Sequence, residues 1–138
     1  MSFDLKSALV VSTSGMRGQA SRLRVVAENM ANAQSTATEP GGEPFRRKTI
    51  SFRAQLDHTS GIETLKVDRI GRAPGDFRRI HDPDHPAADE SGYVLQANVD
   101  PLVEMMDMRE AQRSYEANLN TLSTARSMLI RTIELLRG

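Results

Sequence analysis

The sequence contains no cysteine and no tryptophan, and only six of its 138 residues are aromatic. Without cysteine, the chain has no disulfide scaffold, no thiolate metal site and no cysteine nucleophile. With so few large rings, a compact core rich in aromatic packing is also excluded. Eighteen basic residues balance 18 acidic ones, so the formal net charge is zero. This balance argues against a protein dedicated to binding nucleic acid or an anionic membrane.

Long hydrophobic runs are also missing. The longest strongly apolar run near the start covers residues 8–11, which is too short for the core of a signal peptide. No stretch approaches the roughly 20 apolar residues that a membrane-spanning helix needs. We therefore expect no direct membrane insertion. The chain is expected either to stay in the cytoplasm or to leave the cell by a route that needs no cleaved signal.

The N-terminal segment, residues 1–34, carries a helical pattern from residue 4 onward. Apolar side chains recur every seven residues, and a second, offset series contains polar Ser12 and Gln19. Together the two series predict a long helix with an imperfect a/d seam. Gly15 and Gly18 are poor helix formers, each costing about 1 kcal/mol relative to alanine. We expect this stretch to be loose in an isolated monomer and to become ordered on packing. The first series comprises Leu9, Met16, Leu23 and Met30.

Residues 35–100 form a different kind of segment. Residues 39–44 have the composition of a turn, and residues 81–92 combine prolines with acidic side chains, as exposed loops do. Short strands are predicted at residues 49–52, 62–70 and 93–95. We interpret residues 35–100 as a short insert of β-strands and loops between two helices.

The C-terminal segment, residues 101–138, predicts the second and stronger helix. Asp100 is a good N-cap, and Pro101 suits the first helical position because no amide partner is lost there. Two seven-residue series again define an a/d seam. The first comprises Met108, Tyr115, Leu122, Leu129 and Leu136, and the offset series comprises Met105, Gln112, Leu119, Arg126 and Ile133.

These patterns predict a mainly α fold, in which the N- and C-terminal helices pack as an antiparallel coiled-coil pair around a short β/loop insert. A single seam between two such long helices buries little apolar area relative to the chain entropy lost on ordering them. Packing against other chains is therefore favoured. The alternative is an ordinary two-helix hairpin folded over a small sheet, complete as a monomer.

Two parts of the sequence resemble the bacterial flagellar rod and hook proteins. The first is residues 27–33, AENMANA, which continue into residues 38–48, TEPGGEPFRRK. The second is residues 92–94, followed by residues 98–118, which begin NVDPLVEMMDM. Both motifs are long, and the resemblance extends over nearly the whole chain.

The resemblance implies a non-enzymatic, structural role. Proteins of this family are subunits of a helical rod that crosses the periplasm and passes motor torque to the hook. They are exported through the flagellar type III apparatus without a cleaved signal peptide. The partners implied are other rod proteins, the export-gate adaptor at the rod base and the inner-membrane ring protein, together with self-association in a helical tube. The rival interpretation is a soluble coiled-coil adaptor or export chaperone.

Fifteen residues are predicted to form the assembly interface, either from the apolar seams or from the family motifs. We expect Asn29 and Asn32, with Asn98 and Asn118, to cap or bridge backbone groups at junctions. The predicted interface comprises Leu9, Met16, Leu23, Asn29, Met30, Asn32, Arg46, Arg47, Met105, Tyr115, Leu119, Leu122, Arg126, Leu129 and Ile133.

The charged positions allow more than one interpretation. Basic residues 46–48 could contact nucleic acid, but the neutral total charge favours contact with acidic residues between positions 82 and 90 of another subunit. Arg126 lies in the predicted seam, where a lone buried charge is costly. It is expected either to pair between subunits or to extend its charge from the edge of the seam into water.

The sequence offers little to support catalysis or cofactor binding. His81, Asp82, Asp84 and His85 are the one cluster with metal-ligand chemistry. Their spacing matches no helix-based site and prolines interrupt it, so we interpret the cluster as a solvated acidic loop rather than a metal site. No glycine-rich phosphate loop and no nucleophile–base arrangement is evident from motif spacing. We expect no enzymatic activity, no metal and no cofactor.

Overall fold

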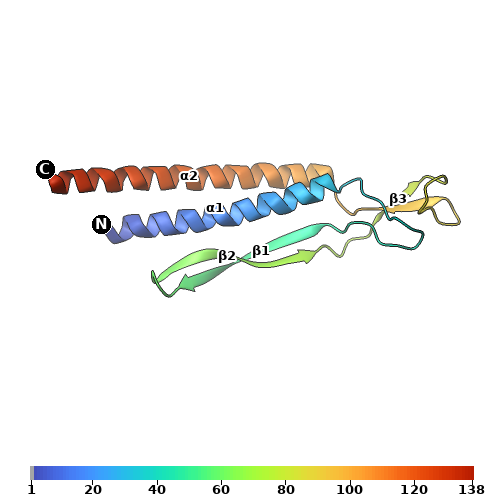
Figure 1. Ribbon diagram of the computed structural model, residues 1–138, viewed down its shortest axis with the longest axis horizontal. Helices are drawn as coiled ribbons and strands as arrows, with labels where there is room; N and C mark the ends of the chain where they lie inside the picture. The colour runs from blue at the N-terminus through green and yellow to red at the C-terminus, as the bar shows by residue number, and fades with distance from the viewer. Residues whose placement is uncertain (1) are drawn as a thin grey trace. The chain divides into compact units, whose positions relative to one another are not determined.

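The computed structural model describes the backbone from Ser2 to Gly138 and the side chains from Asp4 onward; Met1, which the predicted N-terminal segment includes, lies outside the described residues. The chain forms two compact units. Unit 1 contains residues 1–23, 51–69 and 109–138, and unit 2 contains residues 24–50 and 70–108. The elements, in chain order (Figure 1), are α1 (Ser2–Ala31), β1 (Lys48–Asp57), β2 (Ile62–Arg72), β3 (Arg78–His81), β4 (Tyr93–Gln96) and α2 (Pro101–Arg137).

Helix α1 continues without a break through Gly15 and Gly18. Two hydroxyl groups in this stretch bond back to the preceding turn. Thr13 Oγ1 donates to the carbonyl of Leu9 at 2.7 Å, and Ser14 Oγ donates to the carbonyl of Val11 at 2.8 Å. These hydroxyls therefore do not draw the backbone into a competing turn, which is the usual reason why serine and threonine weaken a helix.

Helix α2 begins where the sequence predicts. The Leu102 N–H donates to Asp100 Oδ1 at 3.0 Å, so the Asp100 side chain satisfies one of the free amides of the first turn. Pro101 is the first helical residue and has no amide that needs a partner. The N-cap prediction at Asp100 is confirmed.

In unit 1, helix α1 contacts α2 on one side and the β1–β2 hairpin on the other (Figure 1). Both approaches occur at glycines. A Cβ on Gly15 would lie 2.7 Å from Asn118 Nδ2, and one on Gly18 would lie 2.7 Å from Leu65 Cδ2. The Leu65 N–H also donates to Ser14 Oγ at 3.2 Å. Gly15 and Gly18, which lower the helix propensity of α1, are thus the residues that allow α2 and the hairpin to approach it closely.

Unit 2 contains a second hairpin, in which β3 and β4 pair antiparallel with Arg78 opposite Gln96 and His81 opposite Tyr93. Its core is made of small side chains. One cluster joins Ala33, Ala97 and Val99, with Phe45 packed against it. A second cluster comprises Ala37, Ala87 and Val94, with Ala88 packed against it. Small buried residues are what a chain so poor in aromatic residues has available for close packing.

The prediction of a mainly α fold built on a coiled-coil pair is wrong. Four strands of 10, 11, 4 and 4 residues form two separate two-stranded sheets. Strands β1 and β2 extend beyond the short segments predicted at residues 49–52 and 62–70, and β3 was not predicted at all. Its sequence, RRIH, has exposed side chains throughout and gives no alternating pattern to recognise.

One of the two series predicted for the seam of α2 is wrong, whereas most of the other series, Met108, Tyr115, Leu122 and Leu129, is half-buried. The residues that α2 buries are Glu104, Ala111 and Ala125, which share a seven-residue spacing with half-buried Asn118. The offset series predicted from hydrophobicity is exposed throughout: Met105, Gln112, Leu119, Arg126 and Ile133. Small side chains at the contact allow the helix to approach its neighbours closely, and this outweighs the larger apolar area of the predicted series.

Candidate assembly surface

A buried polar junction in unit 2 connects the end of α1, the segment before β1 and the first turn of α2. Asn29 is 1% exposed and Glu104 is 0% exposed. Asn29 Oδ1 accepts a hydrogen bond from the Lys48 N–H, and Asn29 Nδ2 donates both to the Lys48 carbonyl at 2.9 Å and to Glu104 Oε2 at 3.3 Å. The expected bridging of backbone groups by Asn29 is therefore present within the chain.

Arg47 provides the counter-charge for Glu104. Its Nε donates to Glu104 Oε1, and its Nη2 lies 3.4 Å from Asp107 Oδ2, one turn further along α2. A buried carboxylate requires such a partner because an unpaired charge in the interior is strongly unfavourable. The Arg47 N–H donates in turn to Asn98 Oδ1 at 2.7 Å, which holds the backbone of Arg47 in place.

Arg46 is held by a separate set of contacts in unit 2. Its Nη1 donates to the carbonyls of Ala73 and Gly75 at 2.9 Å each, and its guanidinium lies 4.3 Å from the ring centroid of Phe77. Asn98 Nδ2 donates to the same two carbonyls. Arg46 and Arg47 thus both have partners inside the chain, and their contact with the acidic loop of another subunit stays a prediction.

The other predicted interface residues fall into two groups. On α1, the apolar members are half-buried, and Asn32, which directly follows α1, donates through Nδ2 to the Glu28 carbonyl at 2.9 Å. On α2, Tyr115, Leu122 and Leu129 are half-buried. Arg126 is exposed rather than seated in a seam, and Met105, Leu119 and Ile133 are between 43% and 48% exposed. The half-buried apolar residues of α1 are Leu9, Met16, Leu23 and Met30.

Helix α2 carries large apolar side chains that the rest of the described chain leaves between 43% and 83% exposed. In unit 1 the apolar surface of α2 comprises Leu119, Met128, Ile130, Ile133, Leu135 and Leu136. In unit 2 it comprises Leu102, Val103, Met105 and Met106. Leu135 and Leu136 are the most exposed, at 82% and 83%. Sequence reasoning missed Leu102, Met128 and Leu135 because they fall outside the two seven-residue series used to predict the seam; an unusually apolar helix end was the available signal.

An apolar groove lies beside this surface in unit 1, with a volume of ≈ 370 Å³. Two residues of α1 and five of α2 line it, and none of them is charged. The lining residues are Leu5, Ala8, Asn120, Thr121, Thr124, Ala125 and Met128. Because most of these side chains are small, the space between the two helices stays open at this level.

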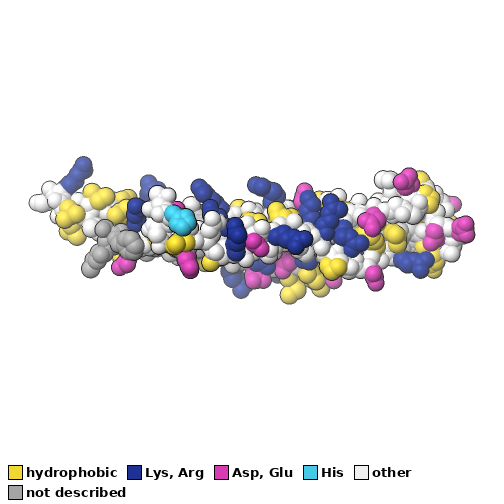
Figure 2. Space-filling view, turned by 90° about the horizontal axis from the view of Figure 1, so that it is seen from below, with side chains coloured by type: hydrophobic (Ala, Val, Ile, Leu, Met, Phe, Trp, Pro, Cys, Tyr) yellow, Lys and Arg dark blue, Asp and Glu magenta, His cyan; other side chains and the backbone are white. Residues whose placement is uncertain are grey.

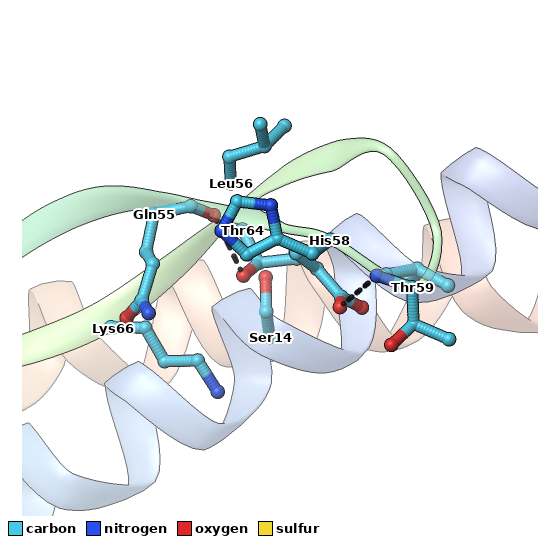
Figure 3. Close-up of a pocket in the computed structure, with 9 residues that line it drawn as sticks. Ser14, Gln55, Leu56, His58, Thr59, Thr64 and Lys66 are labelled. Carbon is cyan, nitrogen blue, oxygen red and sulfur yellow. Dashed lines mark hydrogen bonds between the residues drawn. The ribbon is translucent and has the colours of Figure 1, made fainter.

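A polar cavity of ≈ 420 Å³ lies between α1 and the turn of the β1–β2 hairpin (Figure 3). Three of its polar side chains have structural roles. Ser14 Oγ bonds to Val11 and Leu65, Asp57 Oδ1 accepts from the Thr59 N–H at 3.0 Å, and Thr64 Oγ1 donates across the hairpin to the Gln55 carbonyl. The bond from Thr59 is the main reason why the pKa of Asp57 is lowered. These bonds shape the hairpin turn and do not form a nucleophile–base pair.

The histidines of the loop between β3 and β4 have partners of other kinds. The His81 ring meets Tyr93 edge-on at 5.0 Å, whereas His85 bonds to Thr36 through Nε2 and accepts from the Ala87 N–H through Nδ1. Among residues 4–138, whose side chains are described, no three histidine or carboxylate groups converge as metal ligands would. The loop's carboxylate Asp89 instead pairs with Arg79 at 3.6 Å.

The surface on the side of the β1–β2 hairpin carries basic and acidic side chains interspersed with apolar ones (Figure 2). Pairs such as Arg53 and Asp68, 3.8 Å apart on neighbouring strands, contribute to this mixture. A mixed surface does not provide the continuous positive field that nucleic-acid binding requires. Within the part of the chain that the structure describes, neither helix has an apolar stretch long enough to cross a bilayer.

Comparison with known proteins places these features in a family. The sequence model described as "Flagellar basal body rod FlgEFG protein C-terminal" matches residues 90–135, which include β4 and nearly all of α2. The flagellar basal-body rod protein FlgC of Agrobacterium fabrum is 49% identical over 134 residues, covering 97% of this chain and 96% of its own.

Two further relatives come from distant bacteria. FlgC of Aquifex aeolicus is 42% identical, covering 95% of this chain and 96% of its own, and FlgC of Salmonella typhimurium is 38% identical, covering 91% and 92%. Identity of this level over nearly the full length of each protein includes both helices and both hairpins. The chain therefore belongs to the FlgC family of flagellar basal-body rod proteins, which are structural subunits of the rod.

Proposed function

We propose that this rod subunit stacks helically with other rod proteins in the proximal rod, and that its neighbours cover the apolar surface of α2. The observation that carries the proposal is the exposure of ten large apolar side chains on one helix, within the part of the chain whose side chains are described. Exposed apolar surface of this extent marks a site of protein–protein contact. Each such side chain contributes about 1.5–3 kcal/mol when it is fully buried.

The interface proposed from the sequence agrees with this surface in part. Met105, Leu119 and Ile133 are exposed and available to a neighbour. The half-buried seam residues of α1, together with Tyr115, Leu122 and Leu129, could lose their remaining exposed area on assembly. Asn29, Asn32, Arg46 and Arg47 would then support the interface by fixing the backbone from which neighbouring side chains extend. Arg126, being exposed, is available to an acidic group of another subunit.

The finer aspects of location and partnership follow from the family. We propose that the chain is part of the drive shaft that crosses the periplasm and transmits torque, and that it is exported without a cleaved signal peptide. Its proposed neighbours are other rod proteins, copies of itself, the export-gate adaptor at the rod base and the inner-membrane ring protein. The alternative of a soluble adaptor or export chaperone is not favoured, since the relatives that match over 91–97% of the chain are rod proteins.

The proposal is tested by placing a charge on the apolar surface without disturbing the fold. Ile130 is 45% exposed and Ser127, one turn earlier, is also exposed. We expect Ile130→Asp to prevent incorporation into basal bodies and to abolish swimming, because a carboxylate cannot be buried unpaired against a neighbour. Ser127→Asp is the matched control and is expected to retain both. Normal incorporation and swimming of the Ile130→Asp variant would refute the proposal.

A further inference from the structure

The last turns of α2 extend past the described start of α1. Gly15 faces Asn118, and in unit 1 the two helices run antiparallel with the same rise per residue (Figure 1). By this register Ser2 is level with Arg131. The residues after Arg131 have no level partner on the described part of α1, and for this reason Leu135 and Leu136 are more than four-fifths exposed.

We propose that Leu135 and Leu136 of one copy occupy the apolar groove of a second copy. This inference rests on the proposed function and deepens it by naming the two surfaces that meet. The groove is uncharged, and except for Asn120 it is lined by small or apolar side chains, so it offers space for branched aliphatic ones. The two leucines are the most exposed large apolar side chains among residues 4–138.

Charge at the ends of the two surfaces favours the same pairing. Arg137 directly follows Leu136, and Asp4 directly precedes Leu5 at the rim of the groove; both are exposed. Opposite charges at matching ends attract and help to set the orientation of the incoming helix. The inserting residues and the groove are different surfaces of the chain. The contact is therefore heterologous and can repeat from copy to copy without closing, as a helical rod requires.

The absence of cysteine makes the contact directly measurable by cross-linking. Two variants with different epitope tags, Leu136→Cys and Thr124→Cys, are produced together in cells that lack the native subunit. Basal bodies are isolated and oxidised, and the mixed disulfide is quantified. Within one chain these positions are about 18 Å apart along α2. A disulfide needs Cα atoms closer than about 7 Å, so a cross-link reports on two copies.

The neighbouring position provides the matched control. Ser123 is exposed like Thr124 but does not line the groove. We expect Leu136→Cys to form at least tenfold more mixed disulfide with Thr124→Cys than with Ser123→Cys. Thr121→Cys, at a second exposed position in the groove, is also expected to cross-link. If basal bodies accept the Ser123→Cys chain and exclude the Leu136→Cys chain, this result would also support the contact, because the Leu136 side chain has no role inside its own chain.

A negative result separates this inference from the proposed function. If basal bodies form and neither groove position exceeds the Ser123→Cys background, the contact between leucines and groove is overturned. The rod role would still stand wherever Ile130→Asp blocks incorporation. If Ile130→Asp is incorporated normally, the proposed function itself fails, whatever the cross-linking shows.

Discussion

Asn29 binds both backbone groups of Lys48: its Oδ1 accepts from the Lys48 N–H at 2.8 Å and its Nδ2 donates to the Lys48 carbonyl at 2.9 Å. A side-chain amide is the one group that can supply a donor and an acceptor in this geometry without a charge. Through this pair of bonds, the end of α1 fixes the first residue of β1. Lys48 Nζ adds an exposed ion pair to Glu28 at 2.9 Å.

Removal of the Asn29 amide is expected to destabilise the fold. Asn29→Ala removes this partner from the half-buried backbone groups of Lys48 and from one oxygen of buried Glu104. A fully buried unsatisfied group costs about 1–3 kcal/mol, and the half-buried Lys48 groups cost less because water can reach them. We therefore expect a loss of roughly 2–4 kcal/mol in the free energy of unfolding, measured with urea. Asn32→Ala is the control, since the exposed Asn32 side chain, directly after α1, donates to the Glu28 carbonyl one turn earlier rather than to another element. Equal midpoints for the two variants would contradict the bridging role.

The buried pair of Glu104 and Arg47 is expected to matter far more than an exposed pair on the same helix. Glu104 is fully buried, whereas the Arg47 side chain retains 27% exposure, so water reduces the cost of leaving Arg47 unpaired. We expect Glu104→Ala to lower the free energy of unfolding by about 2–4 kcal/mol. For Glu110→Ala, which breaks an exposed pair with Arg22 at 3.4 Å, we expect less than about 1 kcal/mol. Similar losses in thermal or urea unfolding would show that burial of Glu104 is not decisive.

At position 18, glycine is expected to stabilise the fold more than alanine does, which is the reverse of their usual order in a helix. Alanine favours the helix by about 1 kcal/mol over glycine. At this buried position, however, its Cβ would lie 2.7 Å from Leu65 Cδ2 and 3.3 Å from Phe52 Cε1. Overpacking of this kind typically costs about 1–3 kcal/mol. We expect Gly18→Ala to lower the thermal midpoint in the native background.

The same substitution tested together with Leu65→Ala isolates the steric cause. With the Leu65 side chain shortened, the 2.7 Å clash is removed, and the contact at 3.3 Å to Phe52 Cε1 needs a shift of only a few tenths of an ångström. The gain in helix propensity then dominates. Gly18→Ala should then raise the midpoint relative to Leu65→Ala alone. A stabilising effect of Gly18→Ala in both backgrounds would mean that the hairpin can move away at no cost.

Asp89 is expected to contribute to stability in a pH-dependent way. The Tyr93 N–H donates to its carboxylate at 2.9 Å, and this bond is the main cause of a lowered pKa; the Ser91 N–H and the charge of Arg79 act in the same direction. Because the folded pKa lies below the unfolded one, the contribution is complete above the unfolded pKa. It is lost as the pH falls through the folded pKa.

An NMR titration of the Asp89 side-chain carboxyl carbon measures this pKa directly. It should fall below the ordinary aspartate value of 3.8. An unshifted Asp89 titration would contradict the hydrogen bonds from Tyr93 and Ser91. In Asp89→Asn, which removes the charge, the corresponding acid-dependent loss of stability should disappear.

The two helices and the start of α2 could be predicted because their causes are local, whereas α1 ends at Ala31, three residues before the predicted end at residue 34. Asp100 and Pro101 define the start of α2 through one side-chain bond and one missing amide, and both are visible in the sequence. Leu9 and Met16 mark α1 by their spacing along the chain. Strand β3 could not be found in this way, because its four exposed residues form a strand only by pairing with β4.

The sequence by itself determined which segments are helical, where α2 begins and that apolar side chains outnumber what a two-helix contact can bury. Only the tertiary structure decided which face of α2 is inside. It buries Ala111 and Ala125 and leaves Leu119 and Ile133 exposed, because close approach to neighbouring elements depends on side-chain size at the contact. The hydrophobicity of a residue predicts that its burial is favourable. It does not predict whether the residue is buried by its own chain or by another copy.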